Sequence, residues 1–515
     1  MSDAPELTEN LLIVSDLHLG EGWLTTESVY APREDFVHNG GFFAFLRYHE
    51  ALCQAPRCGG RPWLLVFNGD TFDFVQITSL PEEGDALEAV YGVRRYRDLP
   101  PNTRRFGAGA SRRESVWKFR RIAQGHTSFF AALGWFIQHG NRLLFIYGNH
   151  DLELSWPEVQ AALREAILTA YAEYSDLHGP FPPLAPAQVE AAVQFEPWFY
   201  YDPIRGVYIE HGQQYEPSNH VPDLFAPTLP DQPDYLYQPS GLLMTRYFYN
   251  DLEDLLPYSD NVRPATRAFA WLLSENPLRG AFIFTARLWH LIWASREIRR
   301  KRTRYQRARQ AHPPRVAAPS EHRHLPAPLI ALISDIAQRR ARVSLKYWGQ
   351  TFFEQSVLGL LSLAGLGFLV ASFVTWFQTN DLRAGFLILI GAVLLLNAAR
   401  AWSAYVNHDN RLDYMPGIAR ELQQVFAAAN VPLRAIVMGH SHIPRRLCLA
   451  ESTWMVNTGA WIPLLVQKPW GWEMVSNLTF ARITAPISPS NPPEFLEWDS
   501  ALGEAHYPNL PWESR

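Results

Sequence analysis

The chain has 515 residues, of which 47% are apolar and only 19% are charged, and this composition excludes an intrinsically disordered or highly charged chain. Its 46 basic and 51 acidic residues give a net charge of −5, which excludes a polybasic nucleic-acid binder. Three cysteines exclude a disulfide scaffold and favour a reducing compartment.

Short apolar runs that end in polar residues recur along the first 250 residues and again near residue 440. The runs are 11–15, 63–68, 142–147, 207–210, 435–438 and 453–456. Runs of this length, bounded by Gly, Asn and Asp, are typical of strands that are buried on both faces. Helical patterns such as 157–174 lie between them, so the sequence predicts a layered α/β fold.

The composition changes between residues 250 and 404. Residues 296–342 contain thirteen basic and three acidic residues, and two apolar stretches follow at 356–377 and 384–399. The first stretch is 22 residues without a charge, enough to cross a hydrocarbon core about 30 Å thick. With the short link 378–383, the two stretches predict a transmembrane helical hairpin, and a buried pair of core helices is the alternative.

Basic residues flank the predicted hairpin at its two ends. Four of them lie between 339 and 346 and Arg400 follows, whereas the link contains only Arg383. The positive-inside rule therefore predicts a membrane protein whose two ends, and with them the rest of the chain, are cytoplasmic. The basic residues at 296–309 are predicted to bind anionic lipid headgroups, with a solvated arginine-rich helix as the alternative.

Five short motifs of Asp, Asn and His accompany the strand-like runs. They are Asp16-Leu17-His18, Gly69-Asp70-Thr71-Phe72-Asp73, Gly148-Asn149-His150-Asp151, Glu210-His211-Gly212 and Gly439-His440-Ser441-His442. Taken singly, each fits an ordinary turn or a core histidine. Together they are expected at one rim of an α/β sheet, where such folds bind ligands. Oxygen and nitrogen ligands without thiolate favour Mn, Fe or Zn.

In this order the motifs resemble those of the calcineurin-like metallophosphoesterase superfamily, over residues 8–250 and 405–485. The resemblance implies a four-layer α/β sandwich, here with the transmembrane hairpin inserted, and two divalent metal ions. The implied ligands are Asp16, His18 and His442 for the first ion, Asn149, His211 and His440 for the second, and Asp70 as the bridge. Two such ions clamp an in-line displacement at phosphorus and activate the attacking water.

The same resemblance assigns catalytic roles to the third motif. His150 is expected to protonate the leaving oxygen or to stabilise its charge, and Asp151 to orient His150. Asp73 is expected to support the bridging region, and a loop cap is the alternative for both aspartates. Because every ligand position carries a competent residue, an active hydrolase is favoured over a scaffold that has lost its metals.

The substrate prediction rests on the hairpin, because an anchored site is confined to the membrane surface. The favoured function is hydrolysis of a phosphate mono- or diester or diphosphate at the cytoplasmic membrane surface, with a lipid-linked substrate. The alternatives are a membrane-anchored phosphodiesterase or phosphatase acting on a soluble nucleotide or phosphoprotein, and a non-catalytic membrane scaffold. The expected partners are the phosphorylated substrate and the lipid bilayer, without nucleic acid.

Two segments are predicted to contact the substrate. The residues concerned are Arg112, Arg113, Gln213, Tyr215 and Asn219. The two arginines belong to a segment with ten basic residues, 94–121, and their guanidinium groups suit phosphate, although a solvated helix face is the alternative. The other three follow the ligand His211 directly, and they are expected either to line the pocket or to form a turn.

The predicted organisation has five parts. They are the first part of the metallophosphoesterase domain (8–250), a helical and basic insertion (251–355), the transmembrane hairpin (356–400), the second part of the domain (405–485) and an irregular tail (486–515). The sequence predicts no oligomeric state.

Overall fold

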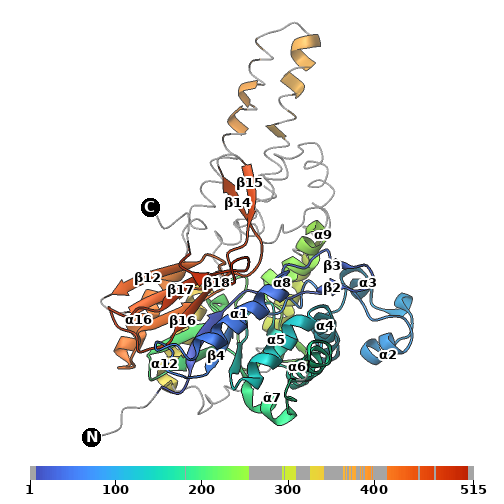
Figure 1. Ribbon diagram of the computed structural model, residues 1–515. Coiled ribbons are helices and arrows are strands. Elements are labelled where there is room, and N and C mark those ends of the chain that lie inside the picture. The colour runs from blue at the N-terminus through green and yellow to red at the C-terminus, as the bar shows by residue number, and fades with distance from the viewer. Residues whose placement is uncertain are drawn as a thin grey trace.

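A computed structural model describes residues 7–179, 181–253, 293–294, 296–308, 325–341, 414–450, 453–468 and 471–508, with isolated residues between 364 and 397. Two large β-sheets with helices on their outer sides make up this part of the chain (Figure 1). Three small hairpins accompany them: β2 (Trp23–Leu24) with β3 (Val29–Tyr30), β9 (Thr228–Leu229) with β10 (Gln232–Leu236), and β14 (Leu464–Lys468) with β15 (Gly471–Val475).

The larger sheet has seven strands in the order β18-β17-β16-β1-β4-β5-β6. Their bounds are β1 Asn10–Val14, β4 Trp63–Asn68, β5 Arg142–Ile146, β6 Val193–Glu196, β16 Thr479–Ile483, β17 Glu494–Asp499 and β18 Glu504–His506. Strands β1, β4, β5 and β6 run parallel, and β16, β17 and β18 extend one edge in antiparallel pairs.

The smaller sheet has five strands in the order β12-β13-β11-β8-β7. Their bounds are β7 Phe199–Asp202, β8 Val207–Glu210, β11 Ala435–Met438, β12 Arg445–Ala450 and β13 Thr453–Asn457. Strands β8, β11 and β13 run parallel, and the two outer strands are antiparallel. The six apolar runs that the sequence predicts as strands are confirmed, each within one residue at either end.

The two sheets pack face to face because side chains alternate along each strand. In β1, Leu11 and Ile13 lie in the apolar cluster between the sheets, together with Val437 of β11. Leu12 and Val14 lie instead in the cluster that includes the covering helices. Residues two apart on a strand point to the same face. Both faces of the strand are thus buried, which explains why the sequence of the run is apolar without interruption.

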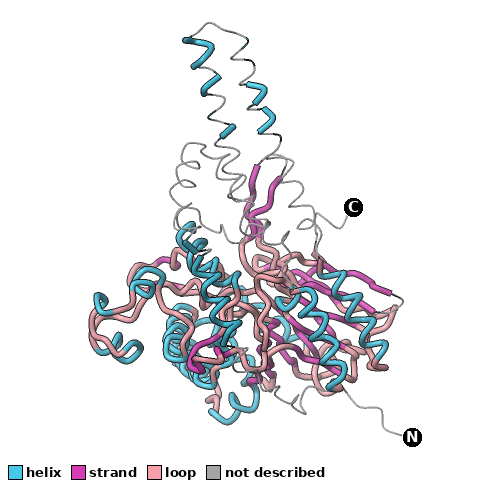
Figure 2. Tube along the Cα trace, turned by 180° about the vertical axis from the view of Figure 1, so that it is seen from behind, coloured by secondary structure: helices cyan, strands magenta, loops and turns pink. Residues whose placement is uncertain are grey.

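Helices cover the outer face of each sheet, so the layers are helices, larger sheet, smaller sheet and helices (Figure 2). Phe42 of α1 (Asn39–Leu52) and Phe129 of α5 (Thr127–Gln138) lie 6.1 and 6.0 Å from the ring of Phe67. Phe426 of α16 (Met415–Ala428) lies 5.4 Å from Tyr208 on the other side. The other helices are α2 Asp85–Tyr91, α3 Pro101–Phe106, α4 Arg112–Gly125, α6 Pro157–His178, α7 Pro186–Ala192, α8 Ser240–Met244, α9 Asn250–Glu253 and α12 Ala327–Arg340. Short helical turns are Tyr96–Asp98, Leu152–Ser155, Gln213–Tyr215 and Thr245–Tyr249.

The prediction of a transmembrane hairpin at 356–400 is corrected. A membrane span needs about 20 consecutive apolar residues in one helix, and none of the described helices is both long and apolar enough to cross a bilayer. Most of 356–400 lies outside the described residues. The described fold is therefore mixed α/β without the inserted hairpin. The predicted membrane localisation, the cytoplasmic orientation and the bilayer partner depended on the hairpin, and they are withdrawn with it.

The tail after residue 486 is more regular than predicted. Strands β17 and β18 add to the edge of the larger sheet, and Phe495, Leu496 and Trp498 are buried there. The prediction of an irregular tail over 486–515 is therefore wrong for these residues, and residues 509–515 lie outside the described part. The apolar pair Phe495-Leu496, with Trp498 two residues after Leu496, was the signal for a strand.

His49 of α1 is buried among aromatic rings and makes stability depend on pH. Its Nδ1 lies 2.9 Å from the carbonyl oxygen of Phe45, and Trp63 and Phe480 pack against its ring. Burial, followed by the charge of Arg482, lowers its pKa to about 3, whereas an unfolded histidine has a pKa of about 6.5. Below pH 6.5 the unfolded chain therefore binds a proton that the native state does not, and the free energy of unfolding decreases as the pH is lowered.

We expect the substitution His49→Phe to remove this dependence. Between pH 7 and pH 5 the parent loses about 2 kcal/mol of stability through His49 alone, and the variant does not. Denaturant unfolding at the two pH values measures the difference. His178→Phe, at an exposed histidine, is the matched control and retains the full loss. Equal losses in the parent and in His49→Phe would show that His49 is protonated in the native state.

Candidate metal centre

The five motifs lie at the rim where the parallel strands of the two sheets end. Asp16 follows β1, Asp70 follows β4 and Asn149 follows β5, all in the larger sheet. His211 follows β8 and His440 follows β11 in the smaller sheet. Because these strands are parallel within each sheet, their carboxyl ends bring the motifs to one edge. The two sheets therefore contribute complementary halves of a single site.

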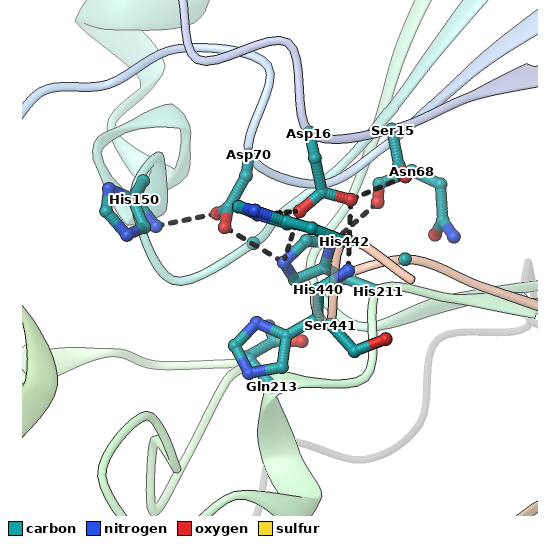
Figure 3. Close-up of polar contacts among 12 residues, drawn as sticks. Ser15, Asp16, Asn68, Asp70, His150, His211, Gln213, His440, Ser441 and His442 are labelled. Atoms are coloured by element: carbon teal, nitrogen blue, oxygen red, sulfur yellow. Dashed lines mark hydrogen bonds and ion pairs between the residues drawn. The ribbon is translucent and has the colours of Figure 1, made fainter. Parts of the chain in front are cut away.

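Two groups of buried side chains each bring one ligand atom per residue within 4.8 Å of the others. Figure 3 shows Asp16 and His442 of one group beside Asp70, His211 and His440 of the other. The groups are Asp16, His18 and His442, and Asp70, His211 and His440. His442 Nε2 lies 3.2 Å from Asp16 Oδ1, and His211 Nε2 lies 3.0 Å from Asp70 Oδ2. The same Asp70 oxygen is 3.9 Å from His18 Nε2, so Asp70 faces both groups. Each group could hold a metal ion.

Several atoms of the site are buried without satisfying their hydrogen-bonding capacity. Asp16 Oδ1, His18 Nε2, Asn149 Oδ1 and His211 Nε2 form no hydrogen bond with the described residues, although Asp16, His18 and His211 face ion-pair partners. Each unsatisfied buried polar atom costs about 1–3 kcal/mol. A divalent cation satisfies such oxygen and nitrogen atoms together. The donor set therefore fits a metal ion, and Asn149 Oδ1, in the loop after β5, is a further buried oxygen without a hydrogen bond to the described residues.

Backbone strain is concentrated at the same residues. Seven non-glycine residues in the described part of the chain have positive φ. Five of them belong to the site, with φ between 50° and 65°: Asp16, His18, Asp70, His440 and His442. The left-handed region costs an L-residue roughly 1–2 kcal/mol, and strain of this kind persists mainly at functional sites. The sequence gives no sign of it.

An acceptor holds the outer ring nitrogen of three of the histidines. The pairs are His18 Nδ1 with Asp73 Oδ2 at 3.0 Å, His211 Nδ1 with the carbonyl oxygen of Asn68 at 2.8 Å, and His440 Nε2 with Glu216 Oε2 at 2.6 Å. Acceptors of this kind fix the tautomer and the ring orientation of histidines that bind metals. The sequence analysis missed Asn68 and Glu216. Asn68 directly precedes the second motif, but Glu216 lies in no motif.

Asp73 also holds His150. His150 Nδ1 lies 2.7 Å from Asp73 Oδ2, the oxygen that also contacts His18. The backbone N–H of His150 donates to Asp70 Oδ1 at 2.7 Å. Burial raises the pKa of Asp73 and the two histidines, His150 first, lower it more strongly, so its pKa lies well below the usual value. Asp73 is therefore an ionised anchor shared by a metal-facing ring and by His150.

Asp151, which the sequence analysis assigned to orient His150, contacts other groups. Its Oδ1 accepts the backbone N–H of Gly148 at 2.7 Å, and its Oδ2 accepts that of Thr71 at 2.8 Å. Asp151 therefore joins the third motif to the second through backbone N–H groups. This is the loop cap that the sequence offered as the alternative role. In the structure Asp73 contacts the His150 ring.

We expect Asp73→Asn to weaken metal binding about 10- to 100-fold, as loss of an outer partner does in metal sites. The neutral amide cannot accept from two imidazoles at one oxygen with the strength of a carboxylate. Calorimetric titration of metal-stripped protein with Mn²⁺ measures the change, and Asp176→Asn, at an exposed position, is the control. A variant that loses stability but binds Mn²⁺ as tightly as the parent contradicts the positioning role.

The charges of the site attract a cation. Burial raises the pKa of Asp16, but His211 and His442 lower it further, to about 2. Asp70 is held well below its usual pKa in the same way, against burial, chiefly by His211 and His150. Burial lowers the pKa of His211, and Asp70 and Asp16 raise it beyond that, to about 9. The ionised carboxylates of Asp16 and Asp70 thus favour positive charge on the His211 ring. A metal ion would compete with the proton for His211 Nε2.

Two glycines of the motifs are required by close approach. A Cβ on Gly148 would overlap the carboxylate of Asp70. A Cβ on Gly439 would lie 2.5 Å from Ser15 Oγ and 2.6 Å from Asp16 Oδ2. Both distances are too short for any contact between heavy atoms that are not hydrogen bonded. Gly148 therefore lets the loop after β5 approach Asp70 after the neighbouring strand β4, and Gly439 lets the loop after β11 approach Asp16 of the other sheet.

The residues predicted to contact substrate are placed differently from one another. Arg112 pairs with Glu158 at 2.9 Å and with Asp234 at 3.3 Å, and Arg113 is exposed on the first turn of α4. The remaining three are buried: Gln213 Nε2 donates to the carbonyl oxygen of Tyr147, Tyr215 OH to Glu210, and Asn219 Nδ2 to Glu216. Of the five, Asn219 is therefore joined to His440 of the second ligand group, through Glu216.

Comparisons with protein-family models, with curated proteins and with solved structures find no match for this chain. The resemblance to calcineurin-like metallophosphoesterases is carried by the five motifs alone. The structure itself shows buried clusters of histidine and aspartate that could hold a metal ion.

Proposed function

We propose that this protein is a phosphoric ester hydrolase with two divalent metal ions. The observation that carries the proposal is that two ligand groups flank one carboxylate, that of Asp70. The proposed ligands are Asp16, His18, Asp70 and His442 for one ion and Asp70, Asn149, His211 and His440 for the other. When bound, such a pair neutralises phosphate charge and lowers the pKa of water, as metal-assisted phosphoryl transfer requires.

His150 is the proposed general acid. Because Nδ1 is tied to Asp73, Nε2 is the nitrogen that would carry the proton for the leaving oxygen. The His150 side chain is 12% exposed, more than any ligand in the two groups, so a substrate could reach it. Its backbone N–H meanwhile fixes Asp70, which couples the position of the acid to that of the bridge. The lipid-linked substrate predicted from the sequence loses its support with the hairpin.

The test is metal removal and reconstitution with a simple ester. Protein stripped with a chelator is titrated with Mn²⁺ while hydrolysis of bis-p-nitrophenyl phosphate and p-nitrophenyl phosphate is followed. We expect activity to vanish on stripping and to return as two ions bind per chain. Activity that is indifferent to the chelator contradicts the proposal. Two bound ions with no turnover of either ester point instead to a non-catalytic scaffold.

A further inference from the structure

A cavity of about 880 Å³ lies next to the loop that orients the proposed metal ligands. Its walls come mainly from residues 217–243 and from the helical residues 298–306, with Ala110 and Ala341, and none of the metal-cluster residues lines it. A volume of this size is within the range that holds a small organic molecule. The cavity is therefore distinct from the metal centre, and its basic wall belongs to a segment that the proposed function leaves without a role.

One short segment, residues 213–220, joins the cavity to the metal centre. Glu216 contacts His440 at 2.6 Å, and the next residue, Pro217, lines the cavity. The carbonyl oxygen of Ser218 accepts hydrogen bonds from Gly241 N at 2.8 Å and from Ser240 Oγ at 3.2 Å, which fixes the segment against α8. A molecule in the cavity would therefore lie against Pro217, the residue next to Glu216. Glu216 in turn contacts the proposed metal ligand His440.

The cavity wall has an excess of positive charge. Its three cationic side chains are Lys301, Arg302 and Arg304, against one acidic residue, Asp231. Arg304 is paired with Asp231 through two nitrogens, at 2.9 and 3.1 Å, and Lys301 donates to a tyrosine hydroxyl at 2.7 Å. Arg302 is half-buried and forms no hydrogen bond or ion pair with other described residues. A guanidinium left unpaired in a concave wall suits an anionic group, phosphate above all.

The cavity also presents aromatic rings and side-chain amides. Tyr237 and Tyr305 both line it, with ring centroids 4.3 Å apart, and Tyr235 is 44% exposed beside them. Three glutamines complete the polar part of the wall: Gln232, Gln238 and Gln306. Tyrosine faces pack on planar rings, and an amide both donates and accepts hydrogen bonds at the edge of a heterocycle.

We propose that this cavity binds a nucleotide-like organic phosphate, with its planar ring against the tyrosines and a phosphate on Arg302. This inference rests on the proposed function, because the segment that holds Glu216 against the proposed ligand His440 continues into the cavity wall at Pro217 and His220. It also gives Arg302, one of the basic residues at 296–308, a role in recognition. The probe that carries both features is ADP.

Binding of ADP to metal-stripped protein, measured by calorimetry, tests the cavity apart from catalysis. We expect Arg302→Glu to weaken ADP binding about tenfold, and Arg302→Gln less. The matched control is Arg307→Glu, the same change on the same helix outside the cavity wall, and it is expected to stay within twofold of the parent. Tyr305→Leu should weaken ADP but not inorganic diphosphate. Circular dichroism verifies that each variant is folded.

Three results overturn the inference. The first is that ADP does not bind the parent. The second is that Arg302→Glu and Arg307→Glu weaken ADP binding equally. The third is that dodecyl phosphate binds more tightly than ADP and that its binding depends on Arg302. The last result replaces the nucleotide by an anionic amphiphile. Failure of the proposed function is separate, because it shows as the absence of metal-dependent hydrolysis of bis-p-nitrophenyl phosphate in a parent protein that still binds ADP.

Discussion

Asp70→Asn is expected to lower kcat/KM for bis-p-nitrophenyl phosphate by about three orders of magnitude and to reduce the bound metal below two ions per chain. One oxygen of Asp70 faces His211 at 3.0 Å and His18 at 3.9 Å, and the other accepts the His150 N–H. The amide keeps the shape and removes the charge shared by both proposed ions. Loss of about 4 kcal/mol of charge stabilisation corresponds to this factor.

The experiment pairs elemental analysis of the purified variant with initial rates at saturating Mn²⁺. Asp176→Asn, an exposed aspartate on α6, carries the same change in charge and should match the parent in both measurements. If Asp70→Asn binds two ions and keeps more than a tenth of the parent rate, Asp70 is not the bridge, and the two-metal proposal fails with it.

Gly148→Ala is expected to reduce activity about 100-fold and to destabilise the protein by about 1–3 kcal/mol, which is typical of overpacking in a closely packed core. The new methyl group would overlap the Asp70 carboxylate and its backbone nitrogen. Either Asp70 moves away from the two ligand groups or the third motif moves away from β4. Both displacements would lengthen the hydrogen bond from the His150 N–H to Asp70 Oδ1, because this bond joins the third motif to Asp70.

Gly417→Ala is the matched control, since a Cβ at that position in α16 meets nothing within 4 Å. It should leave activity unchanged and raise stability by up to about 1 kcal/mol, because alanine favours the helix. Thermal unfolding and hydrolysis rates of the two variants are compared at the same Mn²⁺ concentration. A Gly148→Ala protein with the activity of the parent would show that the second and third motifs do not need this close approach.

The burial of the strands was predictable because both of their faces are covered. Val66 of β4 faces the smaller sheet and Phe67 faces the helices, so neither position tolerates a polar residue and the run is apolar throughout. The strand Glu494–Asp499 has polar residues at its partly buried positions, and its weaker pattern was read as an irregular tail. The transmembrane hairpin was predicted from the length of the apolar stretches at 356–377 and 384–399. The length of an apolar stretch does not establish that a single helix contains it.

The sequence by itself determined which residue types could bind a metal and that they follow strand ends, because the motifs are local and their spacing is set by one strand and one turn. Only the tertiary structure decided which partners they meet. Asp73 contacts two histidines from different motifs, and Glu216 reaches His440 across 224 positions of sequence. These contacts depend on which strands lie side by side within each sheet, and no local pattern records that strand order.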